Sequence, residues 1–241
     1  MNPKKYKKGF EHSYSLGPFP TFELINAAPE RVKEVFISDS FNDKEKLTAL
    51  CREKNIAFSF SDKALQRISD KEAVYAAAAF EKYESDLSED KSHVVLVNPA
   101  DMGNIGTIAR TALGFGFLDL AVIEPAADIF NPKTVRASMG ALFRIRCKRY
   151  PSFDEYLKAA GQRDLFPFML ENAEPLTPET RPKSEKFSLI FGSEARGLPK
   201  EFKDIGKPLY IPQTQMVDSL NLSIAAGIGC FLFRTVWEME N

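Results

Sequence analysis

Residues 93–116 read HVVLVNPADMGNIGTIARTALGFG and indicate the fold class of the whole chain. The first five residues form a short, continuous apolar run, which is the pattern of a buried parallel strand. The chain then turns polar and glycine-rich, and apolar residues recur at helical spacing from Ile105 to Ala112. The segment therefore predicts a buried strand that is followed directly by a helix.

The same order of strands and helices continues on both sides of this segment. Towards the C-terminus, we expect strands at 118–124, 143–150, 165–171, 187–194 and 207–212, and helices at 131–142, 153–161 and 219–240. Towards the N-terminus, we expect strands at 31–38 and 56–60, and helices at 43–55 and 62–69. The alternation predicts an α/β fold with a mostly parallel sheet and helices on both of its faces.

The segment EAVYAAAAF, residues 72–80, could be a helix or a strand. Its alanine content favours a helix on propensity alone. Its position after two strand–helix units favours a strand that closes a small sheet, and we predict the strand. The polar, acidic stretch that follows, 81–92, indicates a linker. The expected organisation is a basic tail (1–12), a small α/β domain (13–80), the linker and a larger α/β domain (93–241).

The composition limits the classes of function. The chain has 241 residues, of which 44% are hydrophobic and 27% charged, as in a soluble globular protein. No apolar run approaches the roughly 18 residues that span a bilayer, so we expect no membrane partner and a cytoplasmic protein. Three widely spaced cysteines and two histidines argue against a disulfide framework, a metal site or a Ser/His triad.

Basic residues gather in one part of the chain, although the net charge is only −1. Residues 129–153 contain six basic side chains and no acidic one, and the tail adds Lys4, Lys5, Lys7 and Lys8. An ordinary solvated surface would explain this distribution. A face that follows a phosphate backbone would explain it equally well.

Three segments carry candidate functional residues at strand ends, where ligands sit in open α/β sheets. In the first, Gly103 and Gly106 share a helical face with Arg110, so they either leave room for a ligand or mark helix packing. Asn104 stands at the expected helix start and could cap it.

The second segment, LIFGSEARGL (189–198), places Glu194 between two glycines. Gly192 and Gly197 permit a turn with positive φ, whose backbone could contact adenine and ribose; a plain β-turn with a surface glutamate is the alternative. In the third segment (211–226), Asp218 or Ser219 could cap the last helix, whose first turn then holds Ser219 and Asn221.

In this order and at these spacings, the segments resemble the SpoU (TrmH-like) branch of the SPOUT RNA methyltransferases. The N-x-G-x-x-x-R motif stands at Asn104–Arg110, R-A-S-M-G-A at Arg136–Ala141, G-S-E-x-x-G-L at Gly192–Leu198, and I-P followed by S-L-N at Ile211–Pro212 and Ser219–Asn221. The resemblance covers residues 93–240. Residues 13–80 also resemble, more weakly, the small ribosomal-protein-like domain with which many members recognise RNA.

The resemblance implies transfer of a methyl group from S-adenosylmethionine to a ribose 2′-hydroxyl of RNA, a trefoil knot in the C-terminal domain, and a homodimer. It implies the following roles. The catalytic group is Arg110, Asn104, Glu194, Ser219 and Asn221; the cofactor contacts are Gly192, Ile211, Leu220, Ser193, Gly197 and Gln213; the RNA contacts are Arg136, Arg144 and Lys133.

Chemistry limits what Arg110 can do in such a reaction. A guanidinium stays protonated, so Arg110 is better placed to bind the adjacent phosphate and stabilise oxyanion character than to act as a base. The base itself is left open between a phosphate oxygen and water. The sulfonium is a strong leaving group, so no metal is expected.

The sequence departs from the family pattern after Ile211-Pro212, where Gln213 and Gln215 replace the usual methionine and glycine. An RNA-binding or ribosome-assembly protein that has lost turnover on the same scaffold is therefore the alternative to an active enzyme. A third class, an unrelated nucleotide-binding enzyme, would need a GxxxxGK[ST] or GxGxxG loop, and neither is present. Because of the ribosomal-protein-like domain, we expect rRNA rather than tRNA as substrate.

Overall fold

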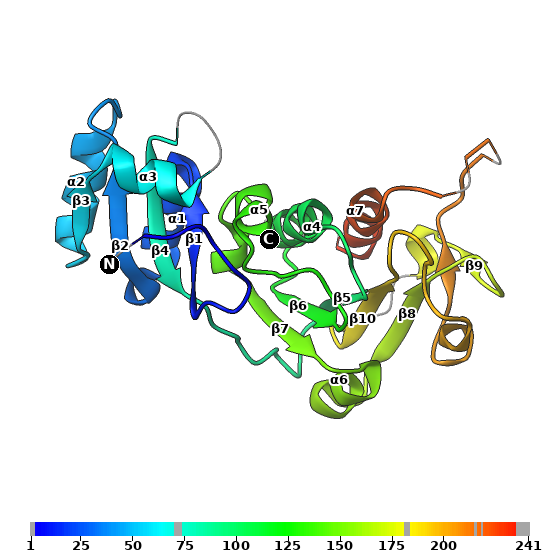
Figure 1. Ribbon diagram of the computed structural model, residues 1–241. Helices are drawn as coiled ribbons and strands as arrows, with labels where there is room; N and C mark the ends of the chain where they lie inside the picture. Colours follow the sequence, from blue (N-terminus) through cyan, green and yellow to red (C-terminus); the bar gives the residue numbers. More distant parts are fainter. Residues whose placement is uncertain (1–2, 70–73, 181–183, 215, 218, 235–241) are drawn as a thin grey trace.

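The computed structural model describes residues 3–69, 74–180, 184–214, 216–217 and 219–234. The chain forms a four-stranded sheet from its N-terminal part and a seven-stranded sheet from the remainder (Figure 1). No helix or strand lies between Glu81 and His93, where we expected a linker. Within the described ranges, no helix combines the length and the apolar character that crossing a membrane requires.

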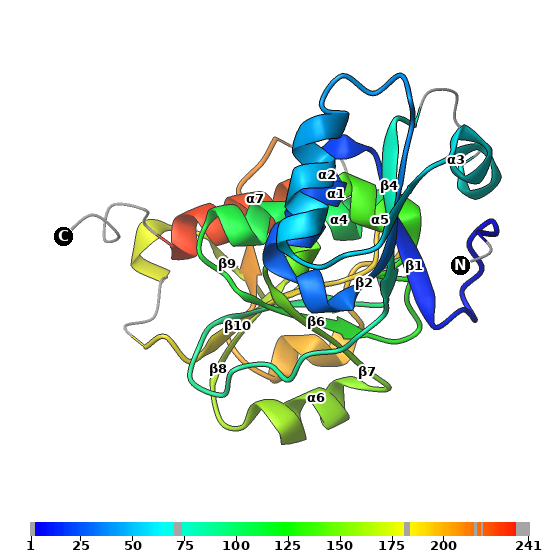
Figure 2. The same cartoon turned by 90° about the vertical axis from the view of Figure 1, so that its left-hand side faces the viewer.

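The N-terminal sheet has the order β1-β4-β2-β3. Its strands are β1 (His12–Leu16), β2 (Val32–Ile37), β3 (Phe58–Phe60) and β4 (Ala76–Glu81). Only β2 and β3 pair in parallel. The alanine-rich segment is the predicted strand, β4. Ala76 and Ala78 pack against α1 (Pro18–Ala27) and α2 (Lys44–Glu53), whereas Ala77 and Ala79 pack against α3 (Asp62–Ile68), so both faces of β4 are covered (Figure 2).

The larger sheet has the order β7-β6-β5-β10-β8-β11-β9, and every pair in it is parallel, as predicted. Its strands are β5 (His93–Val97), β6 (Asp119–Ile123), β7 (Arg146–Tyr150), β8 (Asp164–Phe168), β9 (Glu174–Pro175), β10 (Phe187–Phe191) and β11 (Leu209–Tyr210). Central strands such as β5 and β6 are buried along their whole length. This burial explains their continuous apolar sequences.

Helices cover both faces of the larger sheet, as predicted. One face carries α4 (Met102–Gly114), α5 (Pro132–Ala137) and α7 (Leu222–Phe233), and the other carries α6 (Phe153–Ala160) (Figure 1). Short 3-10 helices occur at Pro29–Arg31, Ala141–Phe143, Pro178–Thr180 and Lys200–Asp204. Along β5, Val94 and Leu96 join the core under α4, whereas Val95 and Val97 join the core around α6.

Several predicted boundaries are wrong. The helix expected at 131–142 ends at Ala137, where Met139 and Gly140 take φ values of 49° and 84°. A side chain at Gly140 would lie 2.3 Å from the Cβ atom of Glu23, so the packing of α1 fixes this turn. The last helix begins at Leu222 rather than at 219, and the strand expected at 207–212 is only β11. Pro167 lies inside β8, where it pairs with Ile190 of β10.

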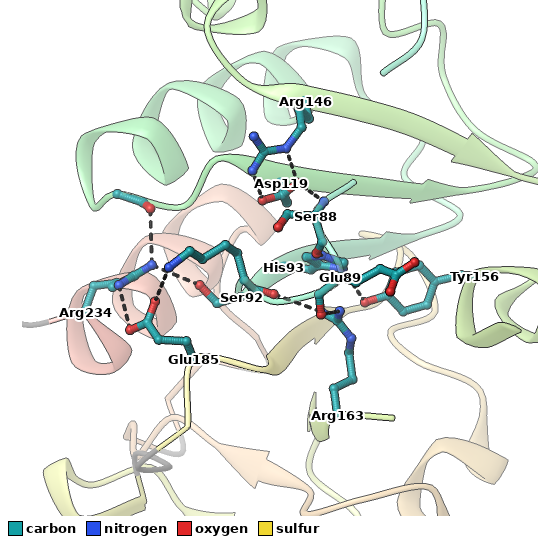
Figure 3. Close-up of polar contacts among 12 residues, drawn as sticks. Ser88, Glu89, Ser92, His93, Asp119, Arg146, Tyr156, Arg163, Glu185 and Arg234 are labelled. Carbon is teal, nitrogen blue, oxygen red and sulfur yellow. Dashed lines mark hydrogen bonds and ion pairs between the residues drawn. The ribbon is translucent and has the colours of Figure 1, made fainter. Parts of the chain in front are cut away.

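The amino ends of the central strands are closed by a polar network (Figure 3). His93 Nε2 donates to the Ser88 carbonyl at 2.7 Å, so Nδ1 is free to accept from the Tyr156 hydroxyl at 2.9 Å. Burial lowers the pKa of His93 to about 4, which keeps the ring neutral. Arg146 pairs with the buried Asp119 through both carboxylate oxygens at 2.6 Å. We therefore infer that these residues at the amino ends of the strands stabilise the fold and do not bind a ligand.

The N-terminal unit packs directly against α5 and the segments that flank it. Phe80 of β4 makes edge-to-face contacts with Phe130 and Phe143 at ring-centroid distances of 5.9 and 5.2 Å. Ser13 donates to the Phe130 carbonyl, and Arg144 pairs with Glu23 at 2.7 Å. One apolar core therefore runs through both units.

The contact of α4 with α5 yields a direct test. A Cβ atom at Gly106 would lie 2.4 Å from the Thr134 carbonyl oxygen and 2.6 Å from Ala137 Cβ. We expect Gly106→Ala to lower the free energy of unfolding by about 1–3 kcal/mol through overpacking. Gly114→Ala in the same helix is the matched control, because no atom lies within 4 Å of that Cβ position. Urea unfolding of both variants measures the difference, and equal stabilities would contradict the packing role.

Candidate functional site

A cavity of about 510 Å³ opens at the carboxyl ends of β8, β10 and β11. Strand ends of this kind are where open α/β sheets bind ligands. Its wall is formed by four segments that are far apart in the chain. They are the end of β8 (Phe168–Glu171), the loop after β10 (Gly192–Leu198), the end of β11 (Leu209–Ile211) and the residues before α7 (Ser219–Leu220).

All the residues expected to contact a cofactor line this one cavity. They are Gly192, Ser193, Gly197, Ile211, Gln213 and Leu220. The sequence motifs therefore identified one composite pocket, although they are separated by up to 28 positions. Leu209, Leu222 and the ring of Phe168 give it an apolar floor, and the loop after β10 adds polar backbone groups.

The two glycines of the loop after β10 have different roles. Gly197 takes a φ of 66°, as expected, and its amide donates to the Ser193 carbonyl at 2.9 Å. Gly192 does not adopt a positive φ, so that expectation was wrong. A Cβ atom at Gly192 would lie 2.0 Å from the carbonyl carbon of Gly197, and this close backbone approach is what requires a glycine.

Glu194 is the acceptor that ties this loop to the start of α4. Its carboxylate accepts the side-chain amide of Asn104 at 2.9 Å and the backbone amides of Ala100 and Asp101 at 3.1 and 3.2 Å. Burial raises the pKa of Glu194, but these hydrogen bonds outweigh it, so that the pKa lies below its ordinary value. The carboxylate therefore remains ionised at neutral pH, next to the positive end of the α4 dipole.

Asn104 links Glu194 to the third segment. Its Oδ1 atom accepts the side-chain amide of Asn221 at 3.2 Å. Asn221 in turn accepts the backbone amide and the hydroxyl of Ser223 at 2.8 and 2.7 Å. We call the connected side chains Glu194, Asn104 and Asn221 the relay. It joins one residue from each of the three motifs.

The structure corrects both predicted helix caps. Asp101 caps α4 by accepting the amide of Asn104 at 2.8 Å, so Asn104 stands in the first turn instead. Asn221 caps α7, and Ser219 does not. Asp218 and Gln215 lie outside the described residues. With Asp101 as cap, the Asn104 side chain is available for the relay, whereas Ser219 lines the cavity.

Arg110 is not brought to the cavity of its own chain. It is exposed on α4, and within the described ranges its side chain has no hydrogen bond or ion pair. Gly106, on the same face of the helix, packs tightly against α5, so at this position the helix-packing interpretation holds. Asn104 and Thr111 lie on another face, which packs on α7; a Cβ atom at Gly227 would lie 3.5 Å from Thr111 Cγ2.

The expected RNA contacts differ in their surroundings. Lys133 and Arg136 are exposed on α5 and form no ion pair within the part of the chain that the structure describes. Arg144 instead pairs with Glu23 across the junction of the two sheets. Its guanidinium is therefore committed to holding the two units together.

Sequence reasoning missed two contributions to the cavity. The end of β8 supplies Met169, Leu170 and Glu171, and the turn after Pro199 supplies Lys200. The apolar run that ends at Glu171 is a strand end, which could have indicated the first group. Nothing in the local sequence distinguishes Lys200 from other surface lysines. Within the described ranges, no group of three or more His, Cys, Asp or Glu side chains is placed to hold a metal ion.

Known proteins match this architecture. The model of the SpoU rRNA Methylase family matches residues 91–231, more than half of the chain. The 23S rRNA (guanosine(2553)-2'-O)-methyltransferase RlmP of Bacillus subtilis (strain 168) is 30% identical over 213 residues, which cover 86% of this chain and 82% of that protein.

Solved structures agree at the level of the fold. The AdoMet-bound rRNA methyltransferase from Sinorhizobium meliloti has a TM-score of 0.78 at 26% identity and covers 92% of this chain and 87% of its own. A structure described as "Structural insights into the 2-OH methylation of C/U34 on tRNA" has a TM-score of 0.53 at 30% identity, covering 61% of this chain and 95% of that one. Since the family model spans most of the larger unit and the Bacillus relative spans most of the chain, this chain belongs to the SpoU rRNA methylase family.

Proposed function

We propose that this chain transfers the methyl group of S-adenosylmethionine to a ribose 2′-hydroxyl of rRNA. Membership of the family makes it a methyltransferase that depends on this cofactor. The observation that carries the proposal is the relay, which joins the three motifs beside a cavity lined by every expected cofactor contact. Such a preorganised set of donors and acceptors is what a transfer site requires.

The cavity fits the cofactor in size and in chemistry. Its volume lies within the range of about 300–1,000 Å³ that is typical of small-molecule sites. Ile211, Leu209 and Phe168 offer apolar contacts to an adenine, and the backbone of the loop after β10 offers polar ones. Gly192 keeps this loop close to its own strand. When bound, S-adenosylmethionine supplies an electrophilic methyl group on a positively charged sulfur.

We assign Glu194 a positioning role rather than that of a base. Its oxygens already accept three hydrogen bonds and its pKa is lowered, so it is poorly suited to take a proton from a hydroxyl. Through Asn104 and Asn221, Glu194 then fixes the start of α4 and the start of α7 relative to the loop after β10. Ser219, which lines the cavity, is the residue that we propose orients the substrate.

Arg110 is the residue that we propose meets the RNA. A charged guanidinium can donate two parallel hydrogen bonds to the phosphate beside the target ribose and can stabilise oxyanion character on the 2′-oxygen. It is exposed and has no partner among the residues that the structure describes, which leaves its donors available. The proton of the hydroxyl would then leave to a phosphate oxygen or to water.

Ribosomal RNA is favoured over tRNA because of the N-terminal unit. The relative named for 23S rRNA matches 86% of this chain, whereas the structure named for tRNA matches 61%. We propose that residues 13–80 form an RNA-recognition domain and that Lys133 and Arg136 extend its contact surface. The competing proposal is an RNA-binding protein without turnover. The presence of Gln213 in the cavity favours that alternative, and a measurement of cofactor binding separates the two.

We also propose that the active unit is a homodimer and that the C-terminal region is a trefoil knot. The exposed apolar residues Ile224 and Phe231 of α7, 55% and 51% exposed, support the dimer. A second copy on the α4/α7 face would cover these side chains together with Arg110, and we propose that this pairing completes the site. For the knot, the support is that α7 returns from the far end of the sheet to pack on α4.

The catalytic proposal is tested by tritium transfer from labelled S-adenosylmethionine into total rRNA and total tRNA. We expect label in rRNA, and we expect Arg110→Ala to reduce the rate by about 10²–10³ through loss of the transition-state donor. Cofactor affinity should not change, because Arg110 does not line the cavity. Thr107→Ala, at an exposed position on the same helix, is the matched control. Label in tRNA alone would refute the rRNA assignment, and full activity of Arg110→Lys would exclude a bidentate role.

The dimer proposal is tested by sedimentation velocity. We expect Ile224→Asp with Phe231→Asp to give a folded monomer that transfers no label, because two carboxylates cannot be buried in an apolar interface. Phe19→Asp is the control, since Phe19 is similarly exposed, at 52%, on α1 of the other unit. A wild-type chain that sediments as a monomer and remains active would contradict the proposal.

A further inference from the structure

The basic N-terminal tail is attached to the body of the protein near the functional edge of the larger sheet. The Tyr6 hydroxyl donates to the carboxylate of Asp128, which follows β6. Lys82 Nζ donates to the Lys8 carbonyl at 2.7 Å and lies over the Tyr6 ring at 5.6 Å. The Lys4 amide donates to the Tyr14 hydroxyl at 3.3 Å. A charged, polar segment is thus held in one place.

This attachment leaves the lysine charges facing solvent. Lys4, Lys7 and Lys8 are exposed, and within the described ranges no ion pair neutralises their ammonium groups. Nearby acids are engaged or few: Asp128 accepts from Tyr6, and Glu11 is the exposed carboxylate within the segment. Burial and the hydrogen bond to Asp128 raise the pKa of Tyr6, so its hydroxyl stays a donor. The attachment orders the tail without consuming its positive charge.

A second hollow lies between the tail's anchor and the cofactor cavity. It measures about 880 Å³ and shares the wall Ser193–Leu198 with that cavity. Its opposite wall is formed by Pro125, Ala126 and Ala127, directly before Asp128. The Ala127 amide donates to the Pro99 carbonyl at 2.8 Å, which fixes this wall against the strand end that leads into α4. The loop after β10 therefore separates the cofactor cavity from the second hollow. The far wall of that hollow leads to Asp128, to which the lysine-bearing tail is attached.

The chemistry of this path differs along its length. Three prolines and four alanines line half of the hollow and offer a flat apolar surface to a base or a ribose, and the charged residues Asp101, Glu194 and Arg196 lie beside them. The tail offers unpaired ammonium groups, which suit phosphates. A nucleotide strand needs both kinds of surface in alternation. A small-molecule substrate would fit in the cavity alone and would not need this alternation of apolar and charged surfaces.

We propose that the tail is a preorganised phosphate clamp for the RNA strand that runs from the target ribose through the hollow. The partner is the phosphodiester backbone of RNA, bound without base specificity by Lys4, Lys7 and Lys8. The proposal rests on the proposed function for the identity of the ligand. Anchoring through Tyr6 lowers the entropy that a free tail would lose on binding.

The test uses the full chain, a short fluorescent RNA hairpin and a series of salt concentrations. Each lysine–phosphate contact contributes about 0.7–0.9 to the slope of log affinity against log salt. Lys4/Lys7/Lys8→Gln should therefore reduce that slope by about 2–3 and weaken binding at low salt. The matched control is Lys91/Lys158/Lys207→Gln, which removes three exposed cations that lie outside residues 13–80 and line neither hollow. An unchanged slope in the tail variant, or an equal fall in the control, would overturn the proposal.

A second variant separates the anchor from the charge. Tyr6→Phe keeps every lysine but removes the hydroxyl that donates to Asp128. We expect faster tryptic cleavage within residues 4–8 and weaker hairpin binding with an unchanged salt slope. Faster cleavage with wild-type affinity would show that anchoring does not assist binding.

Cofactor binding and methyl transfer are measured separately on the same proteins. Calorimetry should give the same S-adenosylmethionine affinity for the wild type and the tail variants, because no tail residue lines the cavity. A wild type that transfers no label but loses its salt slope with the tail lysines would refute the proposed function and leave the clamp intact. A wild type that transfers label, with a salt slope that the tail substitutions leave unchanged, would support the proposed function and refute the clamp.

Discussion

The arrangement of the site depends on one carboxylate that is fully occupied by hydrogen bonds. Glu194 accepts two backbone amides from the start of α4 and the side-chain amide of Asn104. Asn104 passes the connection on to Asn221, the cap of α7. Three segments that are far apart in the chain are thereby held in one geometry. Because the carboxylate lies near the surface, its contribution to global stability is small, and its effect is on the position of the segments.

The two edges of the larger sheet have opposite characters. At the amino edge, the buried His93 and Tyr156 share a hydrogen bond, and the buried Asp119 accepts two hydrogen bonds from Arg146 (Figure 3). At the carboxyl edge, the strands open into two hollows that share one loop. A neutral, closed edge opposite an open, polar one explains why the buried histidine takes no part in the proposed chemistry. The N-terminal unit packs beside the open edge and adds positive charge to it.

Much of this organisation was predictable from the residues. Continuous apolar runs identified the buried parallel strands, and their ends identified the segments that form the cavity. The closing strand β4 was predictable from its place in the order of elements, although its alanines favour a helix. The motif resemblance supplied the cofactor contacts as a set. These signals are local, or follow from the rule that ligands bind at strand ends.

Other features depend on contacts between distant residues, so no local pattern reveals them. Asp101 and Asn221 cap their helices, so α4 begins one residue after Asp101 and α7 one residue after Asn221. Gly192 is required by the backbone of Gly197, although the sequence had suggested a positive φ there, and packing against α5 decides between the two roles that the sequence left open for Gly106. The partner of Arg144, Glu23, is 121 residues away in the chain. β1 and α1 were not predicted, because α1 has prolines in its first turn and weak amphipathic spacing.

The most direct test of this account is a double-mutant cycle between Glu194→Gln and Asn221→Ala, measured as S-adenosylmethionine affinity by calorimetry. In Glu194→Gln, the side-chain amide would place an N–H group where the carboxylate now accepts hydrogen bonds from three N–H donors. Glu194 and Asn221 share no hydrogen bond with each other, so coupling between them must pass through Asn104. The account predicts a coupling energy of about 0.5 kcal/mol or more that disappears in an Asn104→Ala background. Strictly additive losses, or no loss in either single variant, would contradict it.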